Sequence, residues 1–286
     1  MTLSTTADRP RSTGRDPGCA RAMLSVSNVT KHFSLSGTQM TVVDDLSMDV
    51  AAGEFVSIIG PSGCGKSTLF SMIGGLVAPS AGSIRIDGEM VAEPHPAIGI
   101  VFQEDSTLPW RDVLGNVAFP LELRKLPKRE RQERAQHFVD LVGLGGFERH
   151  MPSELSGGMR QRVALARTLA QEPKLLLMDE PFAALDEQTR LLLGDKVTEI
   201  QQALKQTVVL ITHNITEAVQ LSDRIVVMTY RPGRFKRAID IGLPRPRSSD
   251  IVGSDGFGRY VAEIWHDLRE EASRGLVETE RRARER

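Results

Sequence analysis

The chain has 286 residues, of which 40% are hydrophobic and 26% charged, ordinary values for a globular protein with one large domain or two small ones. Its formal net charge of −1 gives no overall attraction to nucleic acid or to an anionic membrane. No run approaches the ~18 apolar residues that a membrane-spanning helix needs. The two cysteines, Cys19 and Cys64, cannot build a disulfide framework, which fits a reducing cytosol. The composition therefore argues against a membrane domain, a disulfide-stapled scaffold and a basic nucleic-acid-binding protein.

The first elements predicted along the chain are short strands. Residues 1–22 are rich in Ser, Thr, Arg, Gly and Pro and lack the apolar segment of a secretory signal, so we expect a disordered N-terminal tail. Residues 23–29 alternate between apolar and polar side chains, and 42–50 and 82–86 are further strand-like stretches, the last followed by an Asp87-Gly88 turn. These patterns predict antiparallel strands.

The most informative segment is a glycine-rich loop at residues 60–68. It follows an apolar run at 55–59, typical of a buried strand, and precedes a helical stretch at 69–73. This order predicts a P-loop, in which backbone N–H groups and a helix N-terminus surround the phosphates of a nucleoside triphosphate. Lys66 would reach the β- and γ-phosphates, and the Ser67 hydroxyl would bind Mg²⁺. The expected phosphate-binding residues are Gly60, Pro61, Ser62, Gly63, Cys64, Gly65, Lys66, Ser67 and Thr68.

The later part of the chain has the rhythm of an α/β protein. From about residue 114 to 144 the pattern is helical, with a charged amphipathic stretch at 128–142. Continuous apolar runs follow at 175–178, 208–211 and 225–228, and an amphipathic segment at 187–204 lies between the first two. Two-sided apolar strands alternating with helices predict a parallel sheet covered on both faces.

Two carboxylates follow the first of these apolar runs. Asp179 ends the predicted strand, as in a Walker B motif, and can hold the Mg²⁺ shell, whereas the adjacent Glu180 can orient or deprotonate the attacking water. Upstream, Ser156 and two glycines begin a predicted helix at 159–170 and form a second anion-binding helix N-terminus.

The segment 155–162, with sequence LSGGMRQR, resembles the signature motif of ATP-binding cassette (ABC) ATPases. Other motifs of that family match in order within residues 23–247. Gln103 resembles the Q-loop glutamine, Asp186 the D-loop aspartate and His213 the switch histidine. Phe33 resembles the aromatic residue that stacks on adenine. Asn214 stands where the family commonly has Asp, and we expect little consequence for hydrolysis.

The resemblance implies an α/β fold, a P-loop NTPase ABC cassette with a RecA-like parallel-sheet core. An antiparallel β-subdomain and an inserted α-helical subdomain at about residues 104–166 complete it. The expected domains are the tail at 1–22, the ABC ATPase domain at 23–247 and a charged, helical C-terminal extension at 248–286, with an amphipathic helix at 257–272.

The resemblance also implies a homodimer that sandwiches two ATP molecules between the P-loop face of one chain and the signature face of the other. Glu180, His213 and Gln103 would be catalytic, and Ser67, Gln103 and Asp179 would hold Mg²⁺. The other nucleotide contacts are expected from the P-loop together with Phe33, Ser156, Gly157, Gly158 and Asp186.

Two further stretches resemble the subunits that energise nitrate, sulfonate and taurine uptake. They are residues 104–117, which include Trp110, and the stretch after the last predicted strand, Arg231-Pro232-Gly233-Arg234 followed by Leu243-Pro244-Arg245-Pro246-Arg247. The resemblance implies an ATPase at the cytoplasmic face of the membrane. Its partners would be permease subunits on separate chains and, indirectly, a periplasmic or extracellular solute-binding protein, with no nucleic acid.

The solute and two other functions stay open at this stage. Nitrate, alkanesulfonate, taurine, a vitamin precursor and bicarbonate are all compatible with the sequence. A soluble ABC ATPase acting as a clamp on another macromolecule is the alternative function. A P-loop kinase conflicts with the signature and with the switch histidine.

Overall fold

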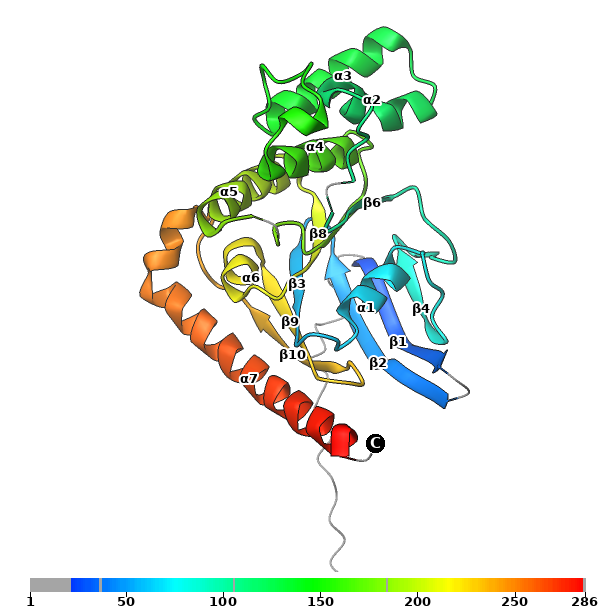
Figure 1. The fold of residues 1–286 in the computed structure, drawn as a ribbon, viewed down its shortest axis with the longest axis vertical. Coiled ribbons are helices and arrows are strands. Elements are labelled where there is room, and N and C mark those ends of the chain that lie inside the picture. The colour runs from blue at the N-terminus through cyan, green and yellow to red at the C-terminus, as the bar shows by residue number, and fades with distance from the viewer. Residues whose placement is uncertain (1–21, 36–37, 105, 184, 285–286) are drawn as a thin grey trace, which may run out of the picture.

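The computed structural model describes residues 22–35, 38–104, 106–183 and 185–284, so the predicted tail lies outside the described residues except for Ala22. An antiparallel sheet holds β1 (Ala22–Leu35), β2 (Thr38–Ala51), β4 (Ala81–Ile86) and β5 (Glu89–Met90), in the order β2-β1-β4-β5 (Figure 1). The predicted antiparallel strands are confirmed, and β1 and β2 are longer than predicted.

The second sheet is parallel except at one edge. Its order in the described part of the chain is β10-β9-β3-β8-β7-β6, and only β10 is antiparallel to its neighbour. Every residue of β3 and β8 is buried, because helices or the other sheet cover both faces. The bounds of the strands are β3 Phe55–Ile59, β6 Ile98–Val101, β7 Leu175–Asp179, β8 Thr207–Ile211, β9 Arg224–Met228 and β10 Phe235–Asp240.

Strand β10 corrects one detail of the sequence analysis. The Arg231-Pro232-Gly233-Arg234 stretch does not follow the last strand but forms the turn between β9 and β10. The strand reads Phe-Lys-Arg-Ala-Ile-Asp, and it is polar because it lies at the edge of the sheet with most of its side chains outside the core.

Helices cover the parallel sheet and extend beyond it. Helix α1 (Lys66–Ile73) packs between the two sheets and shares a core with both. Helix α5 (Glu187–Leu204) packs on the opposite face of the parallel sheet. Helices α2 (Val113–Leu123) and α3 (Lys128–Leu141) form a separate group at the top of Figure 1. Helix α4 (Gly157–Leu169) contacts both of them and β6, so it joins this helical group to the sheet.

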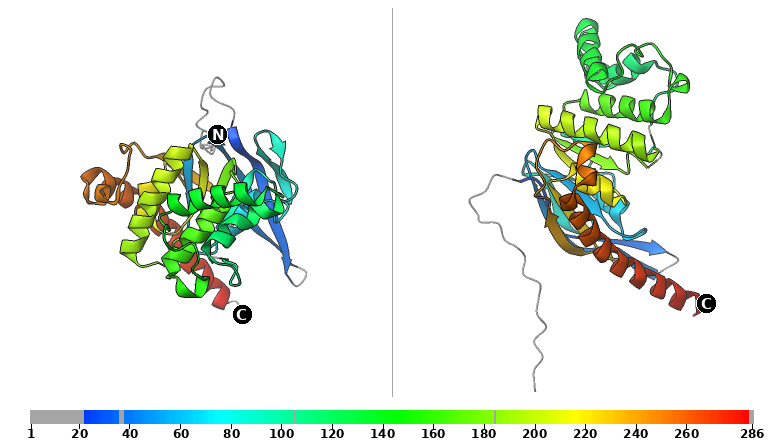
Figure 2. Two further views of the ribbon diagram at one scale, coloured as in Figure 1. Left: turned by 90° about the horizontal axis from the view of Figure 1, so that it is seen from above. Right: turned by 90° about the vertical axis from the view of Figure 1, so that its left-hand side faces the viewer.

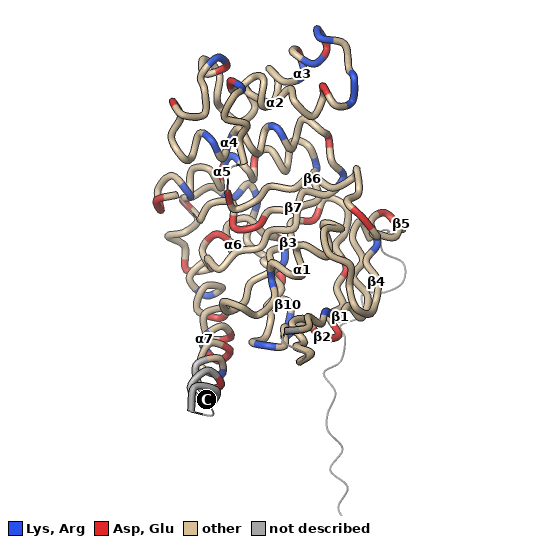
Figure 3. The backbone as a smooth tube through the Cα atoms, turned by 45° about the vertical axis from the view of Figure 1, so that its right-hand side comes forward, with Lys and Arg blue, Asp and Glu red and all other residues tan. Residues whose placement is uncertain are grey.

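The C-terminal part forms a third packed region. Helix α7 (Asp255–Arg284) follows a short 3₁₀ turn (Ser249–Gly253) and lies along α6 (Ile215–Leu221) and β9 (Figure 2). It is longer than the predicted 257–272, and Figure 3 shows basic and acidic residues interspersed along it. Within the described ranges, no helix has the length and apolarity to cross a membrane.

Candidate nucleotide site

The glycine-rich loop lies between the carboxyl end of β3 and the start of α1. Gly63 and Gly65 have φ angles of 73° and 106°, in the left-handed region that side chains other than glycine avoid. A Cβ atom on Gly65 would also lie 3.0 Å from the carbonyl oxygen of Val42 on β2. Helix α1 begins at Lys66, so its first N–H groups face the loop, as anion binding at a helix N-terminus requires.

Lys66 lies inside the loop. Its side chain is only 7% exposed, and Nζ donates to the carbonyl oxygens of Gly60 at 2.8 Å and Pro61 at 3.1 Å. The ammonium is therefore fixed among the backbone groups that would surround a phosphate. Lys66 is almost buried and has no ion-pair partner within the described residues, so its ammonium strongly attracts phosphate oxygens.

Asp179 ends β7 close to the start of α1. Burial, and then the neighbouring charge of Glu180, raise the pKa of Asp179, whereas the charge of Lys66 and a hydrogen bond with the Ser67 side chain lower it. A carboxylate in contact with a hydroxyl is an oxygen donor pair of the kind that Mg²⁺ binds. The residues present therefore fit a magnesium ion.

Glu180 contacts His213. Strands β7 and β8 pair with Asp179 opposite Ile211, and the Glu180 amide donates to the Ile211 carbonyl at 2.8 Å. This register places Glu180 Oε2 3.1 Å from His213 Nδ1. Glu180 is also a non-glycine residue with a φ of 45°, a conformation that its surroundings must enforce. The two side chains predicted to act on the attacking water and the γ-phosphate thus lie together.

A ring of hydrogen bonds holds the turn that carries His213. The Asn214 amide donates to the Thr212 hydroxyl, that hydroxyl donates to Glu217 Oε2, and the Glu217 amide donates to Asn214 Oδ1 at 3.1 Å. Asn214 is the N-cap of α6, a role in which Asn and Asp are about equally good. This gives a physical reason to expect little effect from Asn at this position.

Glu217 was missed by the sequence analysis. It is 6% exposed, and burial raises its pKa to about 7, against the opposing effects of the Thr212 hydrogen bond and the charges of Arg190 and His213. Its Oε1 has no hydrogen-bond partner among the described residues. The Asn-x-x-Glu spacing from 214 to 217, typical of a helix N-terminus, was a usable signal for its position but not for its burial.

The Q-loop glutamine and the predicted adenine-stacking residue lie on other elements. Gln103 is exposed and follows β6 by two residues, at the same end of the sheet as Asp179. Phe33 lies on β1, is 38% exposed, and has Lys31 Nζ 5.2 Å from its ring centroid.

The signature residues lie against the D-loop rather than the P-loop. Ser156 is the N-cap of α4, and its hydroxyl accepts from the Met159 amide at 3.3 Å, so the helix begins at Gly157 and not at the predicted Met159. A Cβ atom on Gly158 would lie 3.1 Å from Thr189 on α5. Asp186 is the N-cap of α5 and accepts from the Thr189 amide at 2.9 Å.

The sequence analysis also missed an arginine that holds the backbone just before Asp186, the D-loop aspartate. Arg190 on α5 donates to the carbonyl oxygens of Leu185 at 2.8 Å and Phe182 at 3.4 Å. No motif marks it, because backbone carbonyls can be held by any nearby donor.

Comparisons with known proteins identify the family of the chain. The family described as "ABC transporter" matches residues 43–183. An uncharacterized ABC transporter ATP-binding protein of Methanocaldococcus jannaschii is 47% identical over 90% of this chain and 95% of its own length. The nitrate transport protein NasD of Klebsiella oxytoca is 40% identical over 92% of this chain and 99% of its own. The aliphatic sulfonates import ATP-binding protein SsuB of Bacillus cereus is 42% identical over 90% and 98%.

A solved structure shows the same fold. A dimeric ATP-binding cassette in a post-hydrolysis state, bound to ADP and phosphate, has a TM-score of 0.68 and 32% identity over 78% of this chain and 100% of its own. Relatives that are 40% and 47% identical over nine tenths of the chain show that it belongs to the ATP-binding proteins of ABC transporters and is an ATPase.

Proposed function

We propose that this chain hydrolyses ATP to energise a membrane importer of a small anionic solute such as nitrate or a sulfonate. The observation that carries the hydrolytic part is the contact of Glu180 with His213. Glu180 is next in the chain to Asp179, on which the charge of the buried Lys66 acts. The names of the relatives from Klebsiella oxytoca and Bacillus cereus support import of nitrate or sulfonates.

The proposed chemistry uses Mg²⁺ with ATP. Ser67, Gln103 and Asp179 would hold the ion, which when bound neutralises charge on the β- and γ-phosphates. Glu180 accepts a proton from the attacking water or orients it. His213 is held through its turn and through Glu180, so that its exposed ring edge is available to the γ-phosphate.

The proposed active unit is a homodimer. In one chain the signature residues Ser156, Gly157 and Gly158 pack near the D-loop and away from the P-loop. A second copy can present its signature helix N-terminus to a γ-phosphate held in the first. The dimeric state of the solved ADP-bound relative supports this arrangement.

The proposed docking surface for a permease subunit is the loop that carries Trp110. Trp110 is 71% exposed. The loop is rigid, because the fully buried Asn116 accepts from the Leu108 amide at 2.7 Å and donates to the Leu108, Arg111 and Asp112 carbonyls at 2.9–3.1 Å. A large apolar side chain held out on a fixed loop is typical of a protein–protein contact. The chain would then be peripheral at the cytoplasmic face of the membrane.

The chain contains a matched control for this docking surface. Its other tryptophan, Trp265 on α7, is 60% exposed. In vesicles reconstituted with the permease subunits, we expect Trp110→Ala to lower solute uptake at least tenfold while ATP turnover of the isolated chain changes less than twofold. Trp265→Ala should leave both rates unchanged. Equal uptake by the two variants would exclude this docking surface.

The solute is identified by growth of a deletion strain on single nitrogen and sulfur sources. A defect on one source that wild-type chain repairs and Glu180→Gln does not would identify the solute and show that hydrolysis powers uptake. Growth on every source, together with failure of the chain to co-purify with any permease subunit, would contradict the importer and favour a soluble clamp.

A further inference from the structure

The turn between β9 and β10 lies against the phosphate loop; we call residues 229–234 the arginine turn. Strand β9 lies next to β3 in the sheet and runs parallel to it. The turn therefore begins at the carboxyl ends of the strands, where the P-loop also begins. Gly233 donates to the Val42 carbonyl at 2.8 Å and accepts from the Asp44 amide at 3.0 Å. A Cβ atom on Gly233 would lie only 2.1 Å from the Cys64 carbonyl oxygen, so the turn touches the loop through backbone atoms.

Arg231 makes the specific contact. Its Nε donates to the Gly63 carbonyl at 2.6 Å, and its Nη2 lies 3.1 Å from the place that a Cβ on Gly63 would occupy. The side chain is exposed. Gly63 has no side chain to restrict its backbone, and it is followed by the peptide groups that reach into α1. An arginine held on one carbonyl is therefore a restraint on the orientation of the whole loop.

We propose that Arg231 is a positioning residue of the phosphate loop, which keeps the Gly63 carbonyl turned away from the nucleotide and adds a positive charge at that wall of the site. A carbonyl oxygen that rotated toward the phosphates would repel them, whereas N–H groups attract them. A charge-assisted hydrogen bond is the stronger kind of bond that can prevent such a rotation. The inference depends on the ATPase and not on the identity of the solute.

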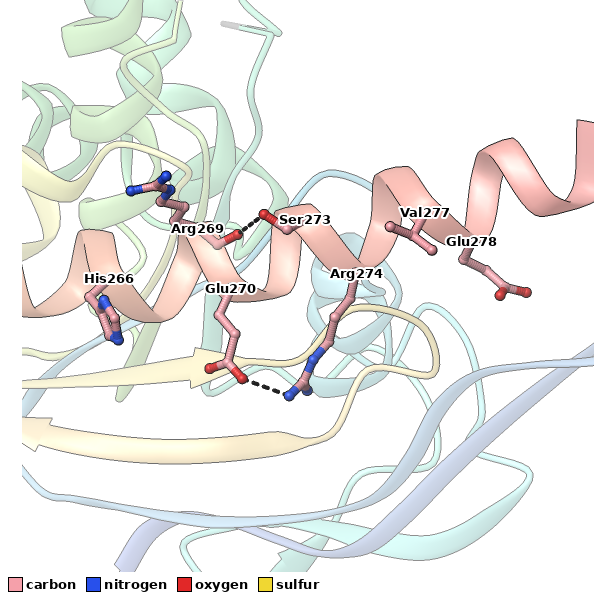
Figure 4. A pocket seen from close by; sticks show the side chains of 7 residues that line it. All are labelled: His266, Arg269, Glu270, Ser273, Arg274, Val277 and Glu278. Carbon is pink, nitrogen blue, oxygen red and sulfur yellow. Dashed lines mark hydrogen bonds and ion pairs between the residues drawn. The ribbon is translucent and has the colours of Figure 1, made fainter.

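Helix α7 fixes the arginine turn from behind. The Tyr230 amide donates to Oε2 of Glu271, which is 1% exposed and also pairs with Lys236 on β10 at 3.0 Å. A Cβ atom on Gly275 would lie 2.8 Å from the Tyr230 ring, so helix and ring are in close contact. Figure 4 shows Glu270 and Arg274 on the same helix, joined by an ion pair of 2.6 Å and directed toward the β9–β10 hairpin. The C-terminal helix thus reaches the P-loop in two steps, through Glu271 and then through Arg231.

The turn supplies its own control. Arg234 lies three residues from Arg231 and pairs with Asp44 on β2 instead of the P-loop. We compare Arg231→Gln with Arg234→Gln in the full chain, measuring the KM and kcat of ATP hydrolysis, the Kd of ATP and ADP, and the midpoint of urea unfolding. For Arg231→Gln we expect KM and both Kd values to rise about tenfold, with kcat and the unfolding midpoint nearly unchanged.

Two further variants, Arg234→Gln and Glu271→Gln, separate the effect of the bond between Arg231 and Gly63 from a general effect on the turn. Arg234→Gln should change KM less than twofold. Glu271→Gln should raise KM about threefold, because the turn is loosened and the arginine remains. Unchanged nucleotide affinity in Arg231→Gln, or equal losses in the two arginine variants, would overturn the proposal, and no effect of Glu271→Gln would remove α7 from it. If the parent chain itself did not bind ATP, the ATPase assignment would fail instead.

Discussion

Replacing Glu217 by Gln tests how the switch turn is built. Glu217 is almost completely buried, one of its oxygens has no partner in the described part of the chain, and its pKa is raised from 4.5 to about 7. Between these two values the folded chain keeps a proton that the unfolded chain has released. The contribution of Glu217 to the free energy of unfolding therefore falls as pH rises from about 4.5 to 7 and no longer changes above that range.

The size of this loss follows from the shift. A pKa raised from 4.5 to about 7 corresponds to between about 3 and 4 kcal/mol, since a tenfold change in an equilibrium constant is about 1.4 kcal/mol. Between about 2 and 3 kcal/mol of it should appear between pH 5 and 8. Glutamine has nearly the same shape and does not titrate, so Glu217→Gln removes the pH-dependent part. Its buried amide adds a cost that is the same at every pH, and the slope is therefore more informative than any single value.

The assay is urea unfolding of the wild-type chain and of Glu217→Gln at several pH values from 5 to 8. Across this range we expect the variant to gain between about 2 and 3 kcal/mol of unfolding free energy relative to the wild-type chain. The charges of His213, Arg190 and Glu180 act on the same carboxyl, so wild type and Glu217→Gln are also compared in a His213→Gln background. Parallel curves for wild type and variant would show that Glu217 ionises normally and would refute the reasoning.

Two other substitutions test the site directly. Glu180→Gln should lower the rate of phosphate release at least a hundredfold, because it removes the carboxylate that acts on the attacking water. ATP binding should be kept, and a stable dimer should accumulate on gel filtration. Phosphate release at the wild-type rate would show that Glu180 does not have this role. Gly233→Ala would place a Cβ 2.1 Å from the Cys64 carbonyl oxygen, so we expect the turn to move away from the P-loop. The free energy of unfolding in urea should fall by about 2 kcal/mol, and the KM for ATP should rise. A variant with wild-type stability and KM would contradict the close packing.

Most of the sheet could be predicted because its strands are buried on both faces. The runs that became β7, β8 and β9 are continuous apolar segments, which few other structures require. Strand β6 was missed because it has only four residues, including Gly99, which lies where a Cβ would meet Thr168 at 2.6 Å. Strand β10 was missed because an edge strand needs little apolar surface.

The site residues that could be proposed from the sequence are those whose chemistry depends on local spacing. The P-loop and the Asp179-Glu180 pair are short motifs at strand ends, and the structure places them together. The contact of Arg231 with Gly63 joins residues that are 168 positions apart, and the burial of Glu217 depends on how α6 packs. Neither leaves a periodic pattern in the sequence, because both arise from packing between distant segments.

The structure divides the site into a part on the sheet and a part on the helices. Lys66 follows β3, and Asp179 and Glu180 lie at the end of β7. Both strands pair with β8, so the relative positions of these residues depend on the register of the sheet. Ser156, by contrast, begins a helix whose first turn rests on the start of α5 through Gly158 and Thr189, where Arg190 holds the D-loop carbonyls. The charge of Arg190 also acts on Glu217 beneath the switch turn. A signature helix that moved relative to the sheet would therefore disturb the D-loop and the switch histidine together, and this coupling lies within one chain.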